Sequence, residues 1–344
     1  MILNIKENQF LEKNEQDSLE ALENIGNKDQ YKELKNFFLL TFVFSWIIWI
    51  IAPFISFGDV YLINGISIIG GYAPSLVAII LTSKNNQKFE VQRKKQVKIF
   101  LIIFILSLTI GIFTTLPIIQ IIPFIVVGSI IAAYIFSSIY SSKKDVAMML
   151  KTLRGIKGHN KSILIAIFLP LGFYLFVYII SLLFGGVYNQ NFSWIAFLIV
   201  LLLGFAQIFF FGGPLNEEPG WRGFATPRLL EKYSPLITGL IIGVIWSIWH
   251  APLHFNGFYG DGLLGFLLRF IYNIPFGIIF TWYYIKSQGN LLGCVFLHTS
   301  LNMFGLFFRI APPSSIIVTI IIIITFYTIV VFLILQDRMY QKSN

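Results

Sequence analysis

The chain has few of the residues that crosslink proteins or bind metals. Its 344 residues include one cysteine, Cys294, and four histidines. A single cysteine excludes an intrachain disulfide and a CxxC-type metal site. The HExxH pattern of many zinc proteases is also missing from the sequence. Charged residues make up only 12% of the chain, which is too little for an ordinary soluble protein of this length.

Long apolar runs are the main feature of the sequence. Apolar residues make up 56% of the chain. Runs of about 18 residues or more, enough for a helix to cross a hydrocarbon layer of about 30 Å, recur along most of it. This pattern predicts an all-α polytopic membrane protein with about ten transmembrane helices. The predicted spans are residues 37–57, 60–82, 99–117, 121–140, 163–184, 194–215, 236–253, 263–285, 290–308 and 315–335.

Basic residues are concentrated in two of the predicted loops. Six lysines and arginines lie between residues 84 and 98, and six more lie between residues 143 and 161. The intervening loops of the first half contain none, so both basic loops are expected in the cytosol. The chain is therefore predicted to be a multi-pass protein of the cell membrane with both termini in the cytosol. The formal net charge of +9 then reflects topology and attraction to anionic lipid, and no nucleic-acid partner is indicated.

The predicted spans divide the chain into four parts. Residues 1–36 contain eight acidic residues and five lysines and lack the apolar core of a signal peptide, so a polar cytosolic tail is expected. Residues 37–190 form the N-terminal helices, residues 191–310 a core of helices in the C-terminal half, and residues 311–344 the last helix and a cytosolic tail. The sequence gives no indication of oligomeric state.

The segment "NEEPGWRG" follows an apolar run and places two carboxylates, Glu217 and Glu218, beside prolines and glycines. Prolines and glycines at this density predict a broken helix. Pro219 is expected in the first turn of the new helix segment. A helical turn near residues 233–235 then places Glu217 and His250 at similar heights, about 24 Å from the turn.

Polar residues also interrupt a later apolar run. His298 and Asn302 are four residues apart in "HTSLN", so they share one helix face. Polar side chains inside a bilayer point into the bundle and indicate a functional site. Three helices thus supply two glutamates, His250, and the pair His298 and Asn302.

Together these segments resemble a known family. "EEPGWRG", "WSIWH" and "HTSLN" match, in order and over about 86 residues, the three motifs of the CAAX protease and bacteriocin-processing (CPBP) family, also called the Abi family, which includes the type II CAAX prenyl endopeptidases. The resemblance covers roughly residues 194–310. Trp246 stands where phenylalanine is common in that family.

The resemblance implies an intramembrane endopeptidase in which a glutamate activates the water. By the same resemblance, Glu217 is the general base, His250 holds the water, and His298 and Asn302 stabilise the oxyanion. Glu218, four residues before Arg222, is expected to form an ion pair that supports the site. A poorly solvated carboxylate beside a second one holds protons more tightly, as a base acting near neutral pH requires.

Other readings of these residues stay open. A zinc metalloprotease could use His250, His254 and Glu217, although Pro252 between the histidines disfavours a common helix face. A non-catalytic scaffold or a bacteriocin self-immunity protein is the alternative function. A transporter is disfavoured because the first half has no matching broken helix. If the chain is bacterial, a bacteriocin, a pheromone or a membrane-protein tail is the expected substrate, and a prenylated protein is not.

Arg269 lies inside the predicted span 263–285, where an unpaired cation is costly. Two placements would compensate the charge of Arg269. The side chain either extends to the surface beside Asp261 or faces the bundle interior with Asn273.

Overall fold

The computed structural model describes residues 31–84, 92–115, 118–184, 194–308 and 316–342, and this part of the chain contains helices and no strand. The first helix is Tyr31–Ile55. The α-helices that follow are α2 (Val60–Gly71), α3 (Ala73–Thr82), α4 (Arg93–Thr115), α5 (Ile122–Ser137), α6 (Lys144–Met149), α7 (Asn160–Leu183), α8 (Trp194–Phe211), α9 (Pro214–Gly220), α10 (Thr226–Leu230), α11 (Pro235–Trp249), α12 (Ala251–Phe255), α13 (Gly262–Lys286), α14 (Leu291–Phe308) and α15 (Ile316–Gln336).

The predicted fold class is confirmed. In the described part of the chain, seven helices are long and apolar enough to cross a membrane. Three shorter apolar helices, Leu201–Phe211, Leu291–Gly305 and Ile323–Gln336, occupy the other predicted spans. Residues 31–36, assigned above to the polar tail, are already helical, and residues 1–30 lie outside the described residues.

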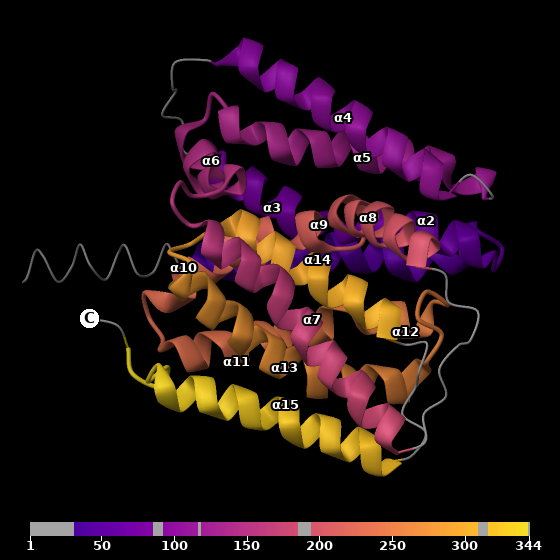
Figure 1. The fold of residues 1–344 in the computed structure, drawn as a ribbon. Helices are drawn as coiled ribbons and strands as arrows, with labels where there is room; N and C mark the ends of the chain where they lie inside the picture. Colours follow the sequence, from indigo (N-terminus) through magenta and orange to yellow (C-terminus); the bar gives the residue numbers. More distant parts are fainter. Residues whose placement is uncertain (1–30, 85–91, 116–117, 185–193, 309–315, 343–344) are drawn as a thin grey trace, which may run out of the picture.

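The short helix α9 lies in the middle of the bundle (Figure 1). It contacts α3 on one side and α14 on another. Helices α4 and α5 run side by side along one edge of the bundle, and α15 runs along the opposite edge (Figure 1). The segment that carries both glutamates is therefore enclosed by helices from both halves of the chain.

Glycines allow the backbones of α11 and α13 to touch. A Cβ atom at Gly243 would lie 2.6 Å from Ile274 Cα, and one at Gly239 would lie 2.7 Å from Ile278 Cα. Gly277 faces this pair from α13. Small residues spaced four apart permit such close packing in membranes, where little hydrophobic force holds helices together. This contact fixes the position of α11, which ends at His250.

The predicted break lies between α8 and α9, and it is confirmed. Helix α8 ends at Phe211, and Gly213 has a φ of +110°, which a residue with a side chain rarely adopts. The predicted place of Pro219 is wrong, because Pro214 opens α9 and Pro219 lies inside it. Pro219 has no N–H to donate to the carbonyl of Leu215, four residues earlier. Ser75 Oγ of α3 donates to that carbonyl instead, at 3.1 Å.

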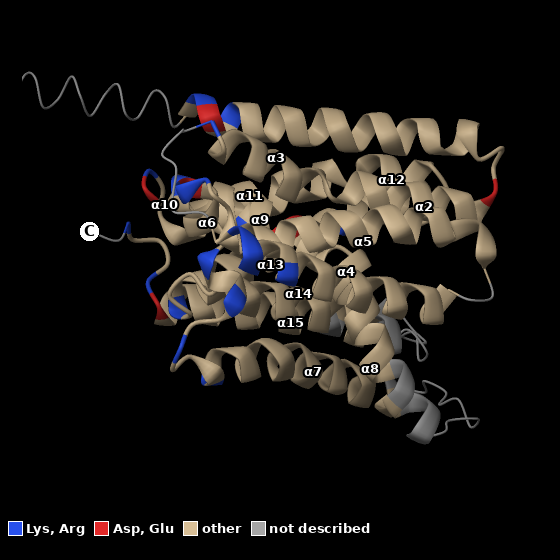
Figure 2. Cartoon of the chain, turned by 90° about the horizontal axis from the view of Figure 1, so that it is seen from above, with Lys and Arg blue, Asp and Glu red and all other residues tan. Residues whose placement is uncertain are grey.

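Lysines and arginines gather at one end of the bundle, the end at which the C-terminus lies (Figure 2). This matches the concentration of basic residues in the loops at 84–98 and 143–161. The positive-inside bias predicts that this end faces the cytosol. The cytosolic placement of both termini stays a prediction.

Candidate active site

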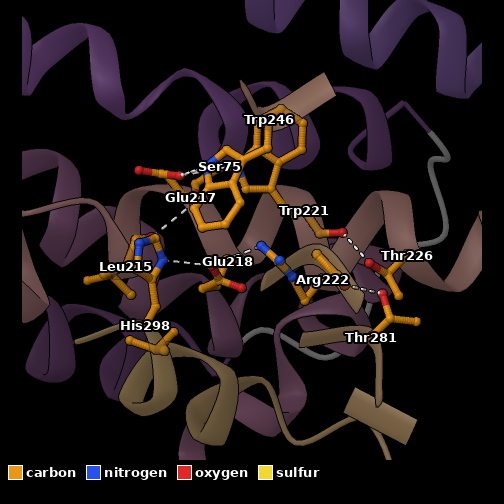
Figure 3. A network of polar contacts seen from close by, with 12 residues as sticks. Ser75, Leu215, Glu217, Glu218, Trp221, Arg222, Thr226, Trp246, Thr281 and His298 are labelled. Atoms are coloured by element: carbon orange, nitrogen blue, oxygen red, sulfur yellow. Dashed lines mark hydrogen bonds and ion pairs between the residues drawn. The ribbon is translucent and has the colours of Figure 1, made fainter. Parts of the chain in front are cut away.

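The two carboxylates of α9 face different neighbours. Glu217 Oε2 accepts hydrogen bonds from the indole N–H groups of Trp246, at 2.7 Å, and Trp221, at 3.3 Å (Figure 3). Glu217 Oε1 lies on the other side, against Gly213, where a Cβ atom would approach it to 2.6 Å. His298 Cε1 lies 3.7 Å from the same point. One oxygen of Glu217 is thus held by the protein, and the other faces the turn between α8 and α9.

Glu218 forms a sealed polar cluster with Arg222 and His298. Its Oε1 accepts hydrogen bonds from Arg222 Nη1, at 3.1 Å, and from His298 Nδ1, at 2.8 Å (Figure 3). The Arg222 guanidinium also lies over the ring of Phe280, 4.1 Å from its centroid. The ion pair predicted from the spacing of Glu218 and Arg222 is therefore present. The contact between Glu218 and His298 was not predicted.

His250 ends α11 and turns its ring toward its own helix. His250 Nδ1 lies 2.7 Å from the carbonyl oxygen of Trp246. A carbonyl can only accept, so Nδ1 carries the proton and Nε2 of the neutral ring is an acceptor. No described hydrogen bond joins His250 to Glu217 directly. Trp246 links them, since its indole binds the glutamate and its carbonyl binds the histidine.

His298 and Asn302 reach the site from α14. Because His298 Nδ1 donates to Glu218, only its Nε2 remains for another partner. Asn302 Nδ2 donates to the carbonyl of Gly212 at 3.0 Å, which ties α14 to the turn before α9. The second hydrogen of this amide is left for another acceptor. The structure therefore brings His298 and Asn302 to the same turn as Glu217 Oε1.

The charged and histidine side chains of the site are all buried, but to different degrees. Glu217 and His250 each retain 5% exposure, and His298 retains 4%. Glu218 and Arg222 are 0% exposed. The first three side chains thus keep a small accessible area, whereas the ion pair is fully enclosed by protein.

Residues outside the three motifs support the site, and the sequence analysis missed them. Trp249 Nε1 donates to Ser45 Oγ at 2.9 Å, and Trp46 Nε1 donates to the Trp249 carbonyl at 2.9 Å. Trp249 in turn packs against His250, with ring centroids 4.7 Å apart. Within the motifs, the spacing of Trp221, four residues after Glu217, could have indicated one supporting contact. A contact separated by about 200 residues leaves no local pattern.

The residues expected for the zinc alternative do not converge. His254 Nδ1 lies 2.6 Å from Asp261 Oδ1, and its Nε2 accepts from Arg269 Nε at 3.5 Å. Both ring nitrogens thus have partners away from Glu217. Within the described part of the chain, no group of three or more histidine, cysteine, aspartate or glutamate side chains is placed to hold a metal ion.

Comparison with known proteins agrees with the motifs. Residues 201–304 match the model of the family described as "Type II CAAX prenyl endopeptidase Rce1-like". This part of the chain is thus similar to the type II CAAX prenyl endopeptidases. It is 24% identical over 280 residues to the CAAX prenyl protease 2 of Methanococcus maripaludis, which covers 78% of this chain and 82% of that protein. The predicted family resemblance is confirmed.

These relatives support the coarser part of the functional prediction, a membrane protease. Nothing in their names concerns bacteriocins, so bacteriocin processing and self-immunity gain no support from them. The matched segment contains both glutamates, His250, His298 and Asn302. The roles of these residues stay predictions.

Proposed function

We propose that this chain is an intramembrane endopeptidase that hydrolyses a peptide bond near the C-terminus of a lipid-anchored polypeptide, with a water molecule activated by Glu217. The observation that carries the proposal is that the two oxygens of Glu217 have different contacts. Two indole N–H groups fix Oε2, so Oε1 keeps a defined position for a water molecule. The relatives named for prenyl endopeptidase activity support a lipid-modified substrate, which departs from the expectation above that a bacterial chain does not act on prenylated proteins.

In the proposed mechanism, Glu217 Oε1 removes a proton from water while the water oxygen attacks the carbonyl carbon of the scissile bond. His250 Nε2, an acceptor in the tautomer described above, accepts a hydrogen bond from the same water. The tetrahedral intermediate then collapses, the C–N bond breaks, and Glu217 returns the proton to the leaving amine. Every atom and charge is balanced without another reactant.

The oxyanion of the intermediate needs donors from α14. Asn302 supplies the second hydrogen of its amide, and His298 supplies an N–H from Nε2. Glu218 accepts from Nδ1 of the same ring and so orients His298 in the site. Donors of this kind contribute about 3–4 kcal/mol each to transition-state stabilisation in a site with little water.

The proposal is tested in cells that carry the wild-type chain, a deletion, or Glu217→Gln. Membrane and secreted peptides are compared by mass spectrometry with terminal labelling. We expect a cleavage product that is lost in both altered strains and retained with Glu231→Gln, a change at an exposed glutamate after α10. Wild-type behaviour of Glu217→Gln in cells that the deletion alters would instead favour the scaffold function.

The zinc alternative is tested on the purified protein. Dialysis against a chelator followed by metal analysis and an activity assay separates the two mechanisms. We expect full activity without bound metal, because the proposed mechanism uses only the side chains of Glu217, His250, His298 and Asn302. Loss of activity on dialysis and its return with zinc would contradict this mechanism.

A further inference from the structure

Arg269 is a cation in an apolar, membrane-crossing helix. It lies in α13 among leucines that are exposed on the outside of the bundle, such as Leu267, 53% exposed. None of the ion pairs within the described residues includes Arg269. Burying an unpaired charge in a membrane costs free energy, so such a residue indicates a functional site. The arrangement is nearer to the first expected placement, because His254 joins Arg269 to Asp261, whereas no described hydrogen bond joins Arg269 to Asn273.

The surroundings of Arg269 orient its guanidinium group. Its Nε faces His254 Nε2 at 3.5 Å, and its Cζ lies 4.5 Å from the ring centroid of Tyr259. His254 Nδ1 faces the carboxylate of Asp261, so the proton of the neutral ring is on Nδ1 and Nε2 accepts from the arginine. Neither Nη group of Arg269 has a hydrogen-bond partner among the described residues. Two parallel N–H groups of this kind match a carboxylate.

Arg269 is also close enough to the candidate active site to act on the same substrate. Tyr259 lies between them, with its ring centroid 6.4 Å from that of His250 and 4.5 Å from Arg269 Cζ. Three extended residues span about 10 Å, which is enough to cover this separation. The other arginine near the site, Arg222, is fully buried and paired with Glu218, so it is not accessible to a ligand.

We propose that Arg269 binds the free C-terminal carboxylate of the substrate and so places a bond a few residues upstream against Glu217. This inference rests on the proposed function, since the C-terminal tetrapeptide of a CAAX substrate ends in such a carboxylate. Tyr259, His254 and Asp261 are positioning residues that hold the guanidinium. A polypeptide with a blocked C-terminus lacks the charge that compensates Arg269 and is disfavoured.

The test compares two farnesylated CAAX peptides that differ only in a C-terminal carboxylate or carboxamide. Their kcat/KM values are measured with wild type, Arg269→Gln, Arg269→Lys and the control Arg154→Met, which removes an exposed arginine. We expect wild type and the control to prefer the carboxylate by about 10- to 100-fold, as for a charged hydrogen-bonded pair. Arg269→Gln should reduce this ratio to about 1. Arg269→Lys should give an intermediate ratio, because lysine keeps the positive charge and lacks the two parallel N–H groups of arginine.

An equal rate for both peptides with wild type, or an unchanged preference in Arg269→Gln, would overturn the inference. An anionic lipid is the competing ligand, so the assays are repeated in nanodiscs of phosphatidylcholine with and without phosphatidylglycerol. A dependence on anionic lipid that disappears in Arg269→Gln, with no carboxylate preference, would also overturn it. Melting temperatures of both Arg269 variants identify any loss of folding.

Binding separates this inference from the proposed function. Fluorescence anisotropy of both labelled peptides is measured with the wild type and with the Glu217→Gln variant. A carboxylate preference in binding that Arg269→Gln removes, without any cleavage by wild type, would retain the binding site and refute the protease. Cleavage without that preference would retain the protease and refute the role of Arg269.

Discussion

At the scale of single residues, the two glutamates of α9 show how adjacent carboxylates acquire different environments. Successive positions of a helix point about 100° apart. Glu217 therefore meets the indole of Trp246 on α11, while Glu218 meets His298 on α14. One carboxylate keeps a free, accessible oxygen, and the other becomes the centre of a buried ion pair.

Trp246→Phe tests the role of the indole donor to Glu217. We expect about a 10-fold loss of kcat, which corresponds to one hydrogen bond to a charged group. Trp221→Phe should cost less through hydrogen bonding, because its bond is longer, at 3.3 Å against 2.7 Å. The measurement is steady-state kinetics on a farnesylated peptide. Wild-type rates for Trp246→Phe would mean that the indole does not position Glu217.

Replacing one partner of the Glu218–Arg222 pair is expected to destabilise the protein more than replacing both. Arg222 Nε and Nη2 and Glu218 Oε2 are buried without a hydrogen-bond partner, so the pair is only partly satisfied. Glu218→Gln should lower the free energy of unfolding by about 3–5 kcal/mol, because it leaves a buried cation uncompensated. Glu218→Gln combined with Arg222→Met should recover most of that loss, as measured by thermal unfolding in detergent. If the free-energy changes of the two single substitutions simply added in the double variant, direct coupling of the two residues would be contradicted.

The sequence predicted the members of this cluster but not all of its contacts. The i to i+4 spacing of Glu218 and Arg222 predicted their pairing, because helix geometry fixes which side chains are neighbours. The contact with His298, 80 positions further along the chain, depends on the rotation of α14 against α9. Helix packing sets that rotation, and no local pattern encodes it.

At the scale of elements, α9 depends on close contact with α3. A Cβ atom at Gly220 would lie 2.5 Å from the carbonyl oxygen of Pro74. The backbones touch here, so no side chain can move away to make room. The position of both glutamates relative to α11 and α14 therefore depends on a glycine.

Gly220→Ala is expected to destabilise the protein by about 1–3 kcal/mol and to reduce activity, since α9 must move away from α3. Gly223→Ala is the matched control. A Cβ atom at Gly223 would meet only Leu291 Cδ2, at 3.4 Å, and Met149 atoms beyond it. Thermal unfolding and peptide cleavage of the two variants provide the comparison. Equal behaviour of the two alanine variants would contradict the role assigned to the α3 contact.

The break before α9 was predictable, whereas the residue at which α9 begins was not. Pro214, Pro219 and several glycines made a continuous helix unlikely to persist, because each proline removes a backbone donor. Pro219 lies within α9 because Ser75, about 140 residues earlier, satisfies the carbonyl that the proline leaves without a donor. Tertiary structure thus supports a position that local helix rules disfavour.

At the scale of the whole molecule, the C-terminal segment closes the bundle. Asp337, just after α15, pairs with Lys286 and accepts a hydrogen bond from Trp282, both at the end of α13. The N–H of Leu236 in α11 donates to the carbonyl of Met339 at 2.9 Å. The segment after α15 thereby joins α11 and α13, two helices of the C-terminal half of the chain.

Asp337→Asn is expected to show a pH-dependent loss of stability. The hydrogen bond from Lys286 is the main cause that lowers the pKa of Asp337 below its ordinary value of 3.8, and burial opposes it. The carboxylate therefore stabilises the fold above that value, and its contribution disappears as the pH falls through the lowered pKa. We expect a melting temperature about 1–2 °C below wild type at pH 7. The difference should vanish near pH 3, and a constant difference would contradict the assignment.

Most of the architecture was predictable from the sequence because membrane helices have a strong, local signal. A run of about 20 apolar residues must form a helix in lipid, where every backbone group needs a partner. The C-terminal end of α8 was less predictable, since glycines and a proline interrupt its apolar run from Gly212 on and the helix ends four residues before the predicted span does. The bounds of α14 were predicted to within one residue, although the polar residues His298 and Asn302 interrupt its apolar run. These interruptions lie at the candidate active site, so the weakest helix signals coincide with the proposed chemistry.

The most direct test of the central claim is hydrolysis of a farnesylated CAAX peptide by purified wild type and Glu217→Gln in nanodiscs, followed by mass spectrometry. We predict a defined C-terminal product with wild type, a rate about 10²–10⁴-fold lower with Glu217→Gln, and similar melting temperatures for both proteins. An undiminished rate for Glu217→Gln, with the same product, would show that this glutamate does not activate the water.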